Sequence, residues 1–428
     1  MFTRSMRLLL LTLCALALTA SAAEARSGSC LVPGATIKCS IWTGKVTAIA
    51  DGDTVYVDVD GDGSHRTVTV RFTGINAMEQ TVYNADPAAR HGHCHALEAT
   101  SRLEGLILRS GWRVRLAAMD ASSASRKRWR RAVAVKIRGR WRDVDRILLD
   151  EGLAVWLPNG NEWLWNASYS TLAERAAAAH RGIWNPTACG RGPEDWAQLR
   201  ISVNGDADGV DEENLNGEWV RIRNLDPARA VHLGGWTLRD SVPGGYVLPE
   251  WVTITPGEEL TVHVGSGINT WTELFMGEKA PIFGNASGGS HGVGDSALLL
   301  DPQGDVRAWT SYPCRLACAD PLEGALHVTA DPVGRESVTV RNSGGVPADL
   351  DGYRLWSHPH VYAFPRAAVL APGEQLQVKV VGDPEEDERL IKYWGKPGAI
   401  LNDSGDVVRL TNLRGTEIDC YAFGAATC

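Results

Sequence analysis

The chain has 428 residues and a formal net charge of −8 at neutral pH. This length is too great for one hydrophobic core, so two or three domains are expected. The acidic balance excludes a protein that coats nucleic acid with its whole surface. After residue 25 no stretch is apolar enough to form a transmembrane helix, which excludes an integral helical membrane protein.

The first 25 residues are typical of a secretory signal peptide. Arg4 and Arg7 precede the apolar run 8–20, and the small-x-small triplet at 23–25 offers a cleavage site. We therefore expect domain 1–25 to be removed, the mature chain to begin near Arg26, and the protein to be secreted to an extracellular location.

Removal of the signal peptide leaves eight cysteines. An even number of cysteines in an exported chain favours disulfide bonds. The spacing predicts four cysteines in the first domain and one closing pair in each later unit. For those later units the expected bonds are Cys314–Cys318 and Cys420–Cys428.

Residues 43–184 combine short strands with helices. Alternating apolar residues predict strands at 55–59 and 68–72, joined by a glycine-rich hairpin turn. Helical spacing predicts three helices, at 96–107, 144–151 and 172–180, and a further strand is expected at 133–137. We therefore expect a small β-barrel carrying helices, an α+β unit, over residues 26–190.

After residue 190 the helical pattern ends, and two stretches of short strands repeat at a spacing of about 115 residues. The corresponding motifs are "VRIRN" at 220–224 and "VTVRN" at 338–342, "LGGWTL" at 233–238 and "LDGYRL" at 350–355, and "PGE" at 256–258 and 372–374. Each copy has the length of an all-β sandwich. The strand "NGEWVRIRN", the strand "LGGWTL" and the "PGE" turn resemble lamin-tail domains, an immunoglobulin-like β-sandwich family. The expected units are 197–318 and 325–428; the second lacks the Asn-Gly-Glu opening.

Five aspartates lie between positions 51 and 62, which raises the question of a bound cation. Residues 58–62 match the first half of a calcium loop, but Arg66 and Thr69 stand where later ligands belong, which favours a hairpin turn. The run 204–209 leaves the same two alternatives. Cys94, between two histidines, is either a metal ligand or, as we favour, a half-cystine.

Asp53 differs from the other aspartates because it lies on the same face of its predicted strand as the apolar residues Val55, Val57 and Val59. Burial of an unpaired carboxylate is costly, so Asp53 needs a cation or a strong hydrogen-bond donor. A metal ion at the rim of the barrel would meet that need.

Five segments, in order, resemble the thermonuclease (staphylococcal-nuclease-like) family over residues 43–184. They are "ADGDTVYV" at 50–57, "VRFTGINAMEQ" at 70–80, "RWRRAVAVKIRG" at 128–139, "LLDEGLAVWLPN" at 148–159 and "HRGIW" at 180–184. The family fold is an oligonucleotide-binding β-barrel (OB-fold) with helices. The resemblance implies a calcium-dependent nuclease that hydrolyses DNA with little sequence preference; RNA as a second substrate stays open.

The resemblance also implies a metal site. Asp53 would be the direct carboxylate ligand of Ca²⁺, joined by Asn76 and the backbone carbonyl of Ala77. Glu79 would position or deprotonate the attacking water.

The same resemblance implies a set of substrate contacts. Arg71 and Arg130, with Arg131 as the alternative to Arg130, would bind the non-bridging phosphate oxygens in the transition state. Trp156 would stack on the substrate. Arg131 and Lys127 would contact it.

Two departures from the family lead to a second hypothesis. Asn76 stands where the family has a carboxylate, and Ala77 where it has threonine, so a weakened metal site is expected. The alternative is a non-catalytic exported protein whose barrel binds nucleic acid or a protein. Residues 102–142 hold thirteen Lys or Arg and only two acidic residues; this basic region either attracts phosphate or is a solvated face. The sandwiches are expected to be accessory modules for an unknown surface or protein partner.

Overall fold

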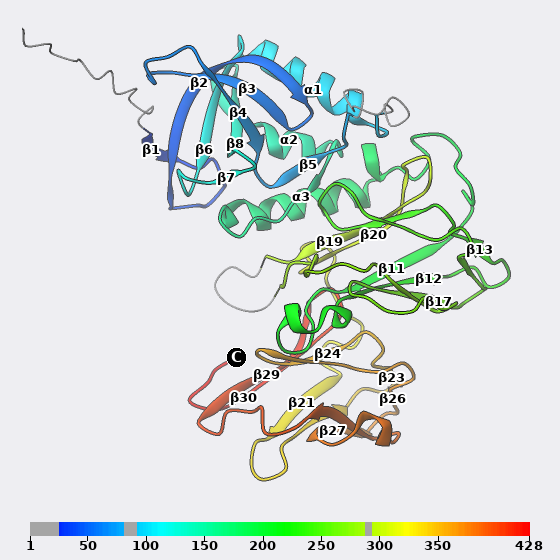
Figure 1. Ribbon diagram of the computed structural model, residues 1–428. Helices are drawn as coiled ribbons and strands as arrows, with labels where there is room; N and C mark the ends of the chain where they lie inside the picture. The colour runs from blue at the N-terminus through cyan, green and yellow to red at the C-terminus, as the bar shows by residue number, and fades with distance from the viewer. Residues whose placement is uncertain (1–24, 81–91, 287–292) are drawn as a thin grey trace, which may run out of the picture.

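The computed structural model describes residues 25–80, 92–286 and 293–428, so the predicted signal peptide lies outside the described residues except for Ala25. Figure 1 shows three units in chain order: a barrel with helices, a first all-β unit and a second all-β unit that holds the C-terminus. Within the described residues, none of the helices has both the length and the apolar character needed to cross a membrane.

Five strands of the first unit form a closed circuit. β2 pairs with β3, β3 with β4, β4 with β8, β8 with β6, and β6 again with β2. β2 can serve both ends of the circuit because two register shifts bend it, between Val46 and Ala48 and between Ile49 and Asp51. The strands are β1 (Arg26–Ser29), β2 (Lys38–Asp51), β3 (Thr54–Val59), β4 (Thr67–Phe72), β5 (Ile75–Ala77), β6 (Arg113–Ala118), β7 (Ala124–Ser125), β8 (Arg128–Ile137), β9 (Arg140–Asp143) and β10 (Ala154–Trp156).

Three helices cover the barrel: α1 (Ala96–Arg109), α2 (Val144–Asp150) and α3 (Asn166–Ala178). α1 and α2 lie where the sequence predicts them, whereas α3 begins earlier. α1 approaches the β2–β3 turn closely at Gly52, where an added Cβ would lie 2.7 Å from the Cβ of Ala99 and 2.8 Å from that of Ala77. Glycine therefore allows the helix and β5 to pack against this turn.

The aspartates at 58–62 make local contacts within a hairpin. Asp62 accepts hydrogen bonds from the backbone N–H of Ser64 (2.8 Å) and from its hydroxyl (3.2 Å). Asp60 accepts from Thr43 (2.6 Å) and pairs with Arg113. These contacts agree with the predicted hairpin turn, because each carboxylate is used to fix the turn or to join it to a neighbouring strand.

The two later units have the same topology, as the sequence repeat predicts. The first contains the sheets β11-β12-β17-β18, β15-β14-β19-β20 and β13-β16, and the second the sheets β21-β22-β27-β28, β25-β24-β29-β30 and β23-β26. In both, the third and fourth strands of the first sheet are parallel. The strands are β11 (Leu199–Asn204), β12 (Trp219–Asn224), β13 (Val231–His232), β14 (Thr237–Arg239), β15 (Tyr246–Val247), β16 (Thr253–Ile254), β17 (Glu259–His263), β18 (Glu273–Phe275), β19 (Asp295–Leu300), β20 (Val306–Tyr312), β21 (Leu326–Asp331), β22 (Ser337–Asn342), β23 (Ala348–Asp349), β24 (Arg354–Ser357), β25 (His360–Ala363), β26 (Val369–Leu370), β27 (Gln375–Val381), β28 (Ile391–Lys396), β29 (Gly405–Thr411) and β30 (Glu417–Gly424).

A buried glutamate shows how closely the two copies correspond. Glu218 accepts a hydrogen bond from the N–H of Ile282 (3.1 Å) in the first sandwich, and Glu336 accepts from Ile400 (2.7 Å) in the second. The second copy therefore keeps the glutamate immediately before its second strand, β22, although it lacks the preceding Asn-Gly. Duplication preserved the contact that fixes a loop to the sheet.

The barrel and the first sandwich share a hydrophobic cluster. The barrel contributes Met78, Ala96, Val155, Ala176, Ala177, Ile183 and Trp184, and the sandwich contributes Leu298, Leu300, Val306 and Trp309. The rings of Trp184 and Trp309 lie 4.9 Å apart. The first sandwich is therefore part of one packed body with the barrel.

Glu174 of α3 joins all three units. Only 2% exposed, it accepts hydrogen bonds from the hydroxyl of Ser311 (2.8 Å) and the N–H of Leu316 (2.8 Å), and it pairs with Arg414 of the second sandwich (3.1 Å). The two sandwiches contact each other through further polar pairs, including Arg221 with Asp351 at 2.8 Å.

Four disulfide bonds connect all eight cysteines of the described chain. The bonds are Cys30–Cys39, Cys94–Cys189, Cys314–Cys318 and Cys420–Cys428. The two pairs expected in the later units are confirmed. Because Cys94 is bonded to another cysteine, its sulfur is not available as a thiolate ligand, although His95 lies beside the pair.

Candidate active site

The register of the barrel brings the predicted site residues to one corner. Asp53 lies in the turn between β2 and β3, and Arg71 lies on β4 opposite Thr54 of β3. Across the parallel pairing of β4 with β8, Arg71 is the partner of Arg130. β5 carries Asn76 and is held in place by pairing with β10.

Asp53 is buried, with 1% of its surface exposed, as the sequence predicts. It lies in the turn before β3, and its partners Arg71 and Thr54 are paired in register on the face opposite Val55. Its carboxylate pairs with Arg71 and accepts hydrogen bonds from the N–H of Ala77 (2.7 Å) and the hydroxyl of Thr54 (3.0 Å). The strong donor that a buried carboxylate requires is therefore present in the protein itself.

Arg71 joins Asp53 to Asn76. The residue is 7% exposed, and its guanidinium donates to Oδ1 of Asn76 at 2.7 Å. Burial lowers the pKa of Arg71 to about 10, while the negative charges of Asp51 and Glu79 act in the opposite direction. The group remains protonated at neutral pH.

Three carboxylates face this one arginine. Burial raises the pKa of Glu79, and the negative charge of Asp51 raises it further, against the opposing effect of Arg71. Burial also raises the pKa of Asp51, whose carboxylate accepts a hydrogen bond from the N–H of Asp53 (3.0 Å). Hard oxygen donors with a surplus of negative charge are the ligands that Ca²⁺ prefers, so the donor set fits a divalent cation. Arg71 would have to give up its contacts to the oxygens of Asp53 and Asn76 that the ion uses.

The two candidate arginines of β8 point to different surroundings. Arg131 is 1% exposed, stacks between the rings of Trp42 (4.5 Å) and Trp129 (4.7 Å), and donates to the carbonyls of Ser123 and Ala121 at 2.7 Å each. Arg130 is half-buried, and burial and the charge of Arg128 lower its pKa. Arg130, not Arg131, can therefore meet a substrate from solvent.

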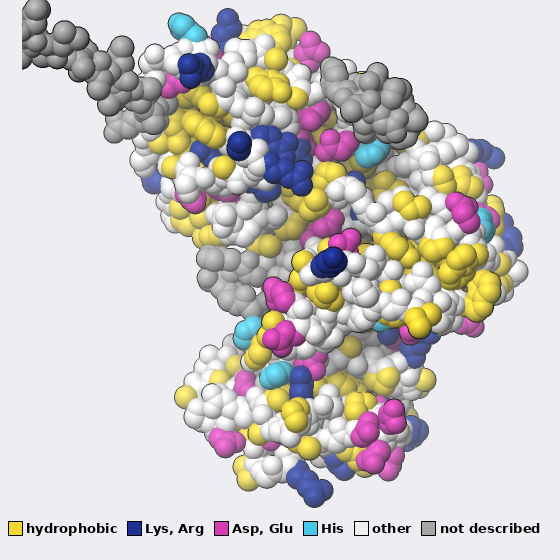
Figure 2. Space-filling view, in the orientation of Figure 1, with side chains coloured by type: hydrophobic (Ala, Val, Ile, Leu, Met, Phe, Trp, Pro, Cys, Tyr) yellow, Lys and Arg dark blue, Asp and Glu magenta, His cyan; other side chains and the backbone are white. Residues whose placement is uncertain are grey.

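The remaining predicted substrate contacts also differ in accessibility. Trp156 is 2% exposed and lies in the barrel core, where its ring N–H reaches Oδ1 of Asn166 at 3.4 Å. It has no free ring face for stacking on a substrate, because the fold uses it for packing. Lys127 is exposed in the turn between β7 and β8. Figure 2 shows Lys and Arg side chains gathered on this face of the barrel, beside acidic side chains.

The first sandwich contributes residues that the sequence did not indicate. Nδ2 of Asn76 donates to the carbonyl of Ser241 at 3.0 Å. Arg239, which is 4% exposed, lies close enough to Glu79 for each charge to shift the pKa of the other. These residues follow Asn76 by more than 160 positions, and no motif connects them to the barrel.

Comparison with protein families identifies the unit that supplies Ser241. Residues 196–314 match the family model of the Lamin Tail Domain. The matched residues form a lamin tail domain. Its bounds agree closely with the predicted 197–318, and it ends just after β20. A comparison of the chain with curated proteins found no match.

The lamin tail domain thus carries the loop that covers Asn76 of the barrel. The second sandwich repeats the strand order of the lamin tail domain without lying in the matched range. The match does not extend to residues 26–190, so the chemistry of the barrel rests on its side chains.

Proposed function

We propose that the barrel is a thermonuclease-like OB-fold domain, that the second sandwich is a further lamin-tail-like domain, and that the protein is a secreted calcium-dependent nuclease. The observation that carries this proposal is the convergence of Asp53, Arg71, Asn76 and Glu79 at one corner of the barrel, with Arg130 in register beside Arg71. A merely structural ion pair would not need the second arginine or the additional acids.

Asp53, Asn76 and the carbonyl of Ala77 would hold the calcium ion. When bound, the ion would polarise a phosphodiester and lower the pKa of a water molecule. Asn76 supplies an oxygen without formal charge, so we expect weaker binding than at a site with two carboxylates.

The protein's own side chains would supply the remaining chemistry. Arg71 and Arg130 have planar guanidinium groups that match the non-bridging oxygens of a phosphodiester and would stabilise the charge that develops on them. Glu79 would accept a proton from the attacking water; its raised pKa makes it a better base than an exposed glutamate. Together these groups support hydrolysis of DNA, with RNA as a second substrate to be tested.

The alternative is an exported binding protein without catalysis. Two observations favour it: an amide stands at position 76, and Asp53 already has a cationic partner in Arg71. In such a protein, the barrel would bind nucleic acid or a protein through its basic face.

The deciding experiment incubates the purified mature protein with plasmid DNA, with calcium or with a chelator. We expect cleavage that depends on calcium and is lost in Glu79→Gln and in Arg71→Lys, which keeps the charge beside Asp53 but loses the fork. Glu98→Gln, an exposed acid of α1, is the matched control and should cleave like the wild type. Full cleavage in the chelator, or by Glu79→Gln, would refute the mechanism.

A further inference from the structure

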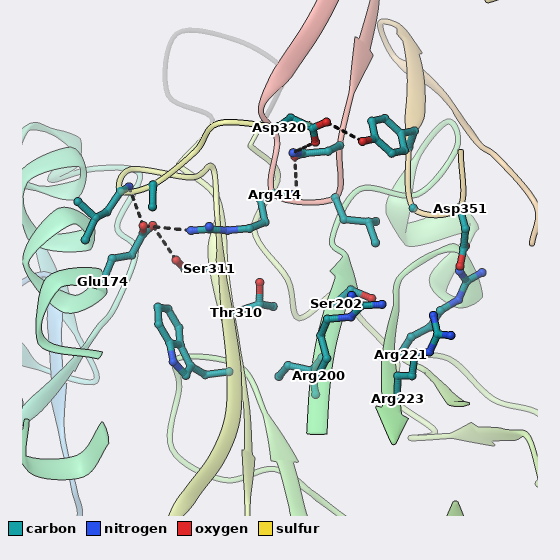
Figure 3. A pocket seen from close by; sticks show the side chains of 18 of the residues that line it. Glu174, Arg200, Ser202, Arg221, Arg223, Thr310, Ser311, Asp320, Asp351 and Arg414 are labelled. Carbon is teal, nitrogen blue, oxygen red and sulfur yellow. Dashed lines mark hydrogen bonds and ion pairs between the residues drawn. The ribbon is translucent and has the colours of Figure 1, made fainter. Parts of the chain in front are cut away.

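A groove lies where the three units meet, apart from the candidate active site. It has a volume of about 590 Å³ and is lined by α3, by β11, β12 and β20 of the lamin tail domain, and by loops at 351–353 and 412–414 of the second sandwich. Figure 3 shows Arg200, Arg221 and Arg223 on one side of this groove and the Glu174–Arg414 pair on the other.

Two arginines of the groove lie directly opposite each other. Arg200 of β11 and Arg223 of β12 are partners in the antiparallel register. Like charges in this position repel and destabilise a sheet. Across the part of the chain that the structure describes, neither guanidinium has an ion pair or side-chain hydrogen bond. Glu259, the partner of Arg223 on the next strand, instead pairs with Arg366 at 2.6 Å and Arg221 at 3.8 Å.

The other acids of the groove are also used. Glu174 is bonded to Arg414 and the 311–316 segment. Asp351 pairs with Arg221, and Asp320 accepts from the hydroxyl of Tyr353 at 2.7 Å and from Asn412 at 2.8 Å. With these carboxylates engaged elsewhere, Arg200 and Arg223 face each other without a direct ion-pair partner, in a lining that holds four arginines and four acids.

Aromatic residues complete the lining. Trp309 of β20 is half-buried, with its ring against Trp184, and also borders the groove. A pair of arginines without ion-pair partners beside a partly exposed aromatic ring is a combination that binds single-stranded nucleic acid, since guanidinium groups contact the phosphates and rings stack on bases. An acidic peptide would use the charges but would leave the aromatic surface without a counterpart.

The groove and the candidate active site meet the same sheet. Arg239, near Glu79, is the register partner of Leu298 on β19, and Leu298 is the partner of Trp309 on β20. Arg239 and Trp309 are therefore two strand spacings apart, which is on the order of 10 Å. The lamin tail domain therefore connects the two places through one rigid element.

We propose that the groove is a second, non-catalytic binding site for the phosphodiester backbone of a single nucleic-acid strand, with Arg200 and Arg223 as its phosphate contacts. This assignment rests on the proposed nuclease function and gives the lamin tail domain a role in holding the substrate.

The test measures binding by fluorescence anisotropy with labelled single strands of about 8 and about 30 nucleotides, the first within and the second beyond the length that one OB domain binds. All proteins carry Glu79→Gln and are kept in chelator to prevent cleavage. We expect Arg200→Ala with Arg223→Ala to weaken binding of the longer strand about tenfold, and to reduce the salt dependence by roughly 0.7 per lost phosphate contact. The shorter strand should be affected less.

The second sandwich provides the matched control, because His327 and Arg341 occupy the corresponding register positions outside the groove. His327→Ala with Arg341→Ala should bind like the parent, and thermal melting of both double variants verifies their folding. Unchanged affinity in the Arg200/Arg223 variant would overturn the proposal. So would an arginine-dependent interaction with a sulfated polysaccharide but not with the strand.

The two proposals can fail separately. Arginine-dependent binding of the longer strand by a protein that never cleaves DNA would refute the nuclease and retain the groove. Calcium-dependent cleavage together with arginine-independent binding would refute the groove and retain the nuclease.

Discussion

Replacement of Asn76 by aspartate tests how the candidate metal site is built. The amide does two things: Oδ1 accepts from Arg71 at 2.7 Å, and Nδ2 donates to the carbonyl of Ser241 at 3.0 Å. Asn76→Asp keeps the acceptor but places a carboxylate oxygen against a carbonyl oxygen. Loss of a buried hydrogen-bond partner costs about 1–3 kcal/mol. For a cooperative unit of 150–250 residues, this corresponds to a fall in melting temperature of about 2–12 °C without metal.

Calcium should reverse the balance. An additional carboxylate increases the charge of the ligand set, and we expect calcium affinity to rise tenfold or more, about 1.4 kcal/mol. The assay is thermal unfolding in chelator and along a calcium titration, with calorimetry for the affinity. Asn342→Asp is the control, because Asn342 donates to the carbonyls of Val346 (2.8 Å) and Leu370 (2.9 Å) in the second sandwich. It should lower the melting temperature without changing the calcium response. Equal calcium affinity in wild type and Asn76→Asp would refute the assignment of this corner as a metal site.

Three further predictions address pH, the shared interface and the longest disulfide loop. Burial raises the pKa of Glu218 from 4.5 to about 8, so its ionisation removes stability as pH rises between these values. Above pH 8, Glu218→Gln should therefore have a higher free energy of unfolding than the wild type, by at least about 1.4 kcal/mol in denaturant unfolding. Below pH 4.5 it should be no more stable than the wild type, and a stability difference that stays constant at all pH values would contradict this. Leu298→Ala should lower the free energy of unfolding by about 2–5 kcal/mol and also reduce DNA cleavage, because it loosens the domain that covers Asn76. The control Leu376→Ala, in the core of the second sandwich, should lower stability by a similar amount and leave cleavage unchanged; equal cleavage by the two variants would argue against a role for the interface. Replacing both Cys94 and Cys189 by serine opens a loop with a sequence separation of 95 and should cost roughly 4–5 kcal/mol on the chain-entropy account, and a denaturant midpoint equal to that of the wild type would refute it.

Local sequence patterns predicted the features that depend on neighbouring residues. Alternation predicted the burial of Asp53 and the strands on either side of the glycine-rich hairpin turn, and helical spacing identified α1 and α2. The two short-range disulfides of the later units could be predicted because each of these units holds only one pair of cysteines. The Cys94–Cys189 bond could not, since a long separation leaves many pairings open.

Contacts between distant segments account for what the sequence missed. Strand parity alone gives Arg71 an outward position, but packing of β5 and the β2–β3 turn over it makes it a buried partner of Asp53. Arg130 and Arg131 are adjacent in sequence, and contacts with distant residues separate their roles: Arg131 packs against Trp42 and Trp129 and donates to nearby carbonyls, whereas Arg130 stays accessible. Ser241 reaches the site through domain packing, which composition and periodicity do not encode.

The pattern of disulfide bonds has a consequence for biogenesis. Along the described chain the first cysteine is bonded to the second, the third to the fourth, the fifth to the sixth and the seventh to the eighth, so no bond spans another. An oxidant that joined the thiols in the order in which they follow one another along the chain would reach the native set directly. If the native bonds crossed one another, joining thiols in this order would first form wrong pairs, which thiol–disulfide exchange would have to correct. In this chain the same order forms only native pairs.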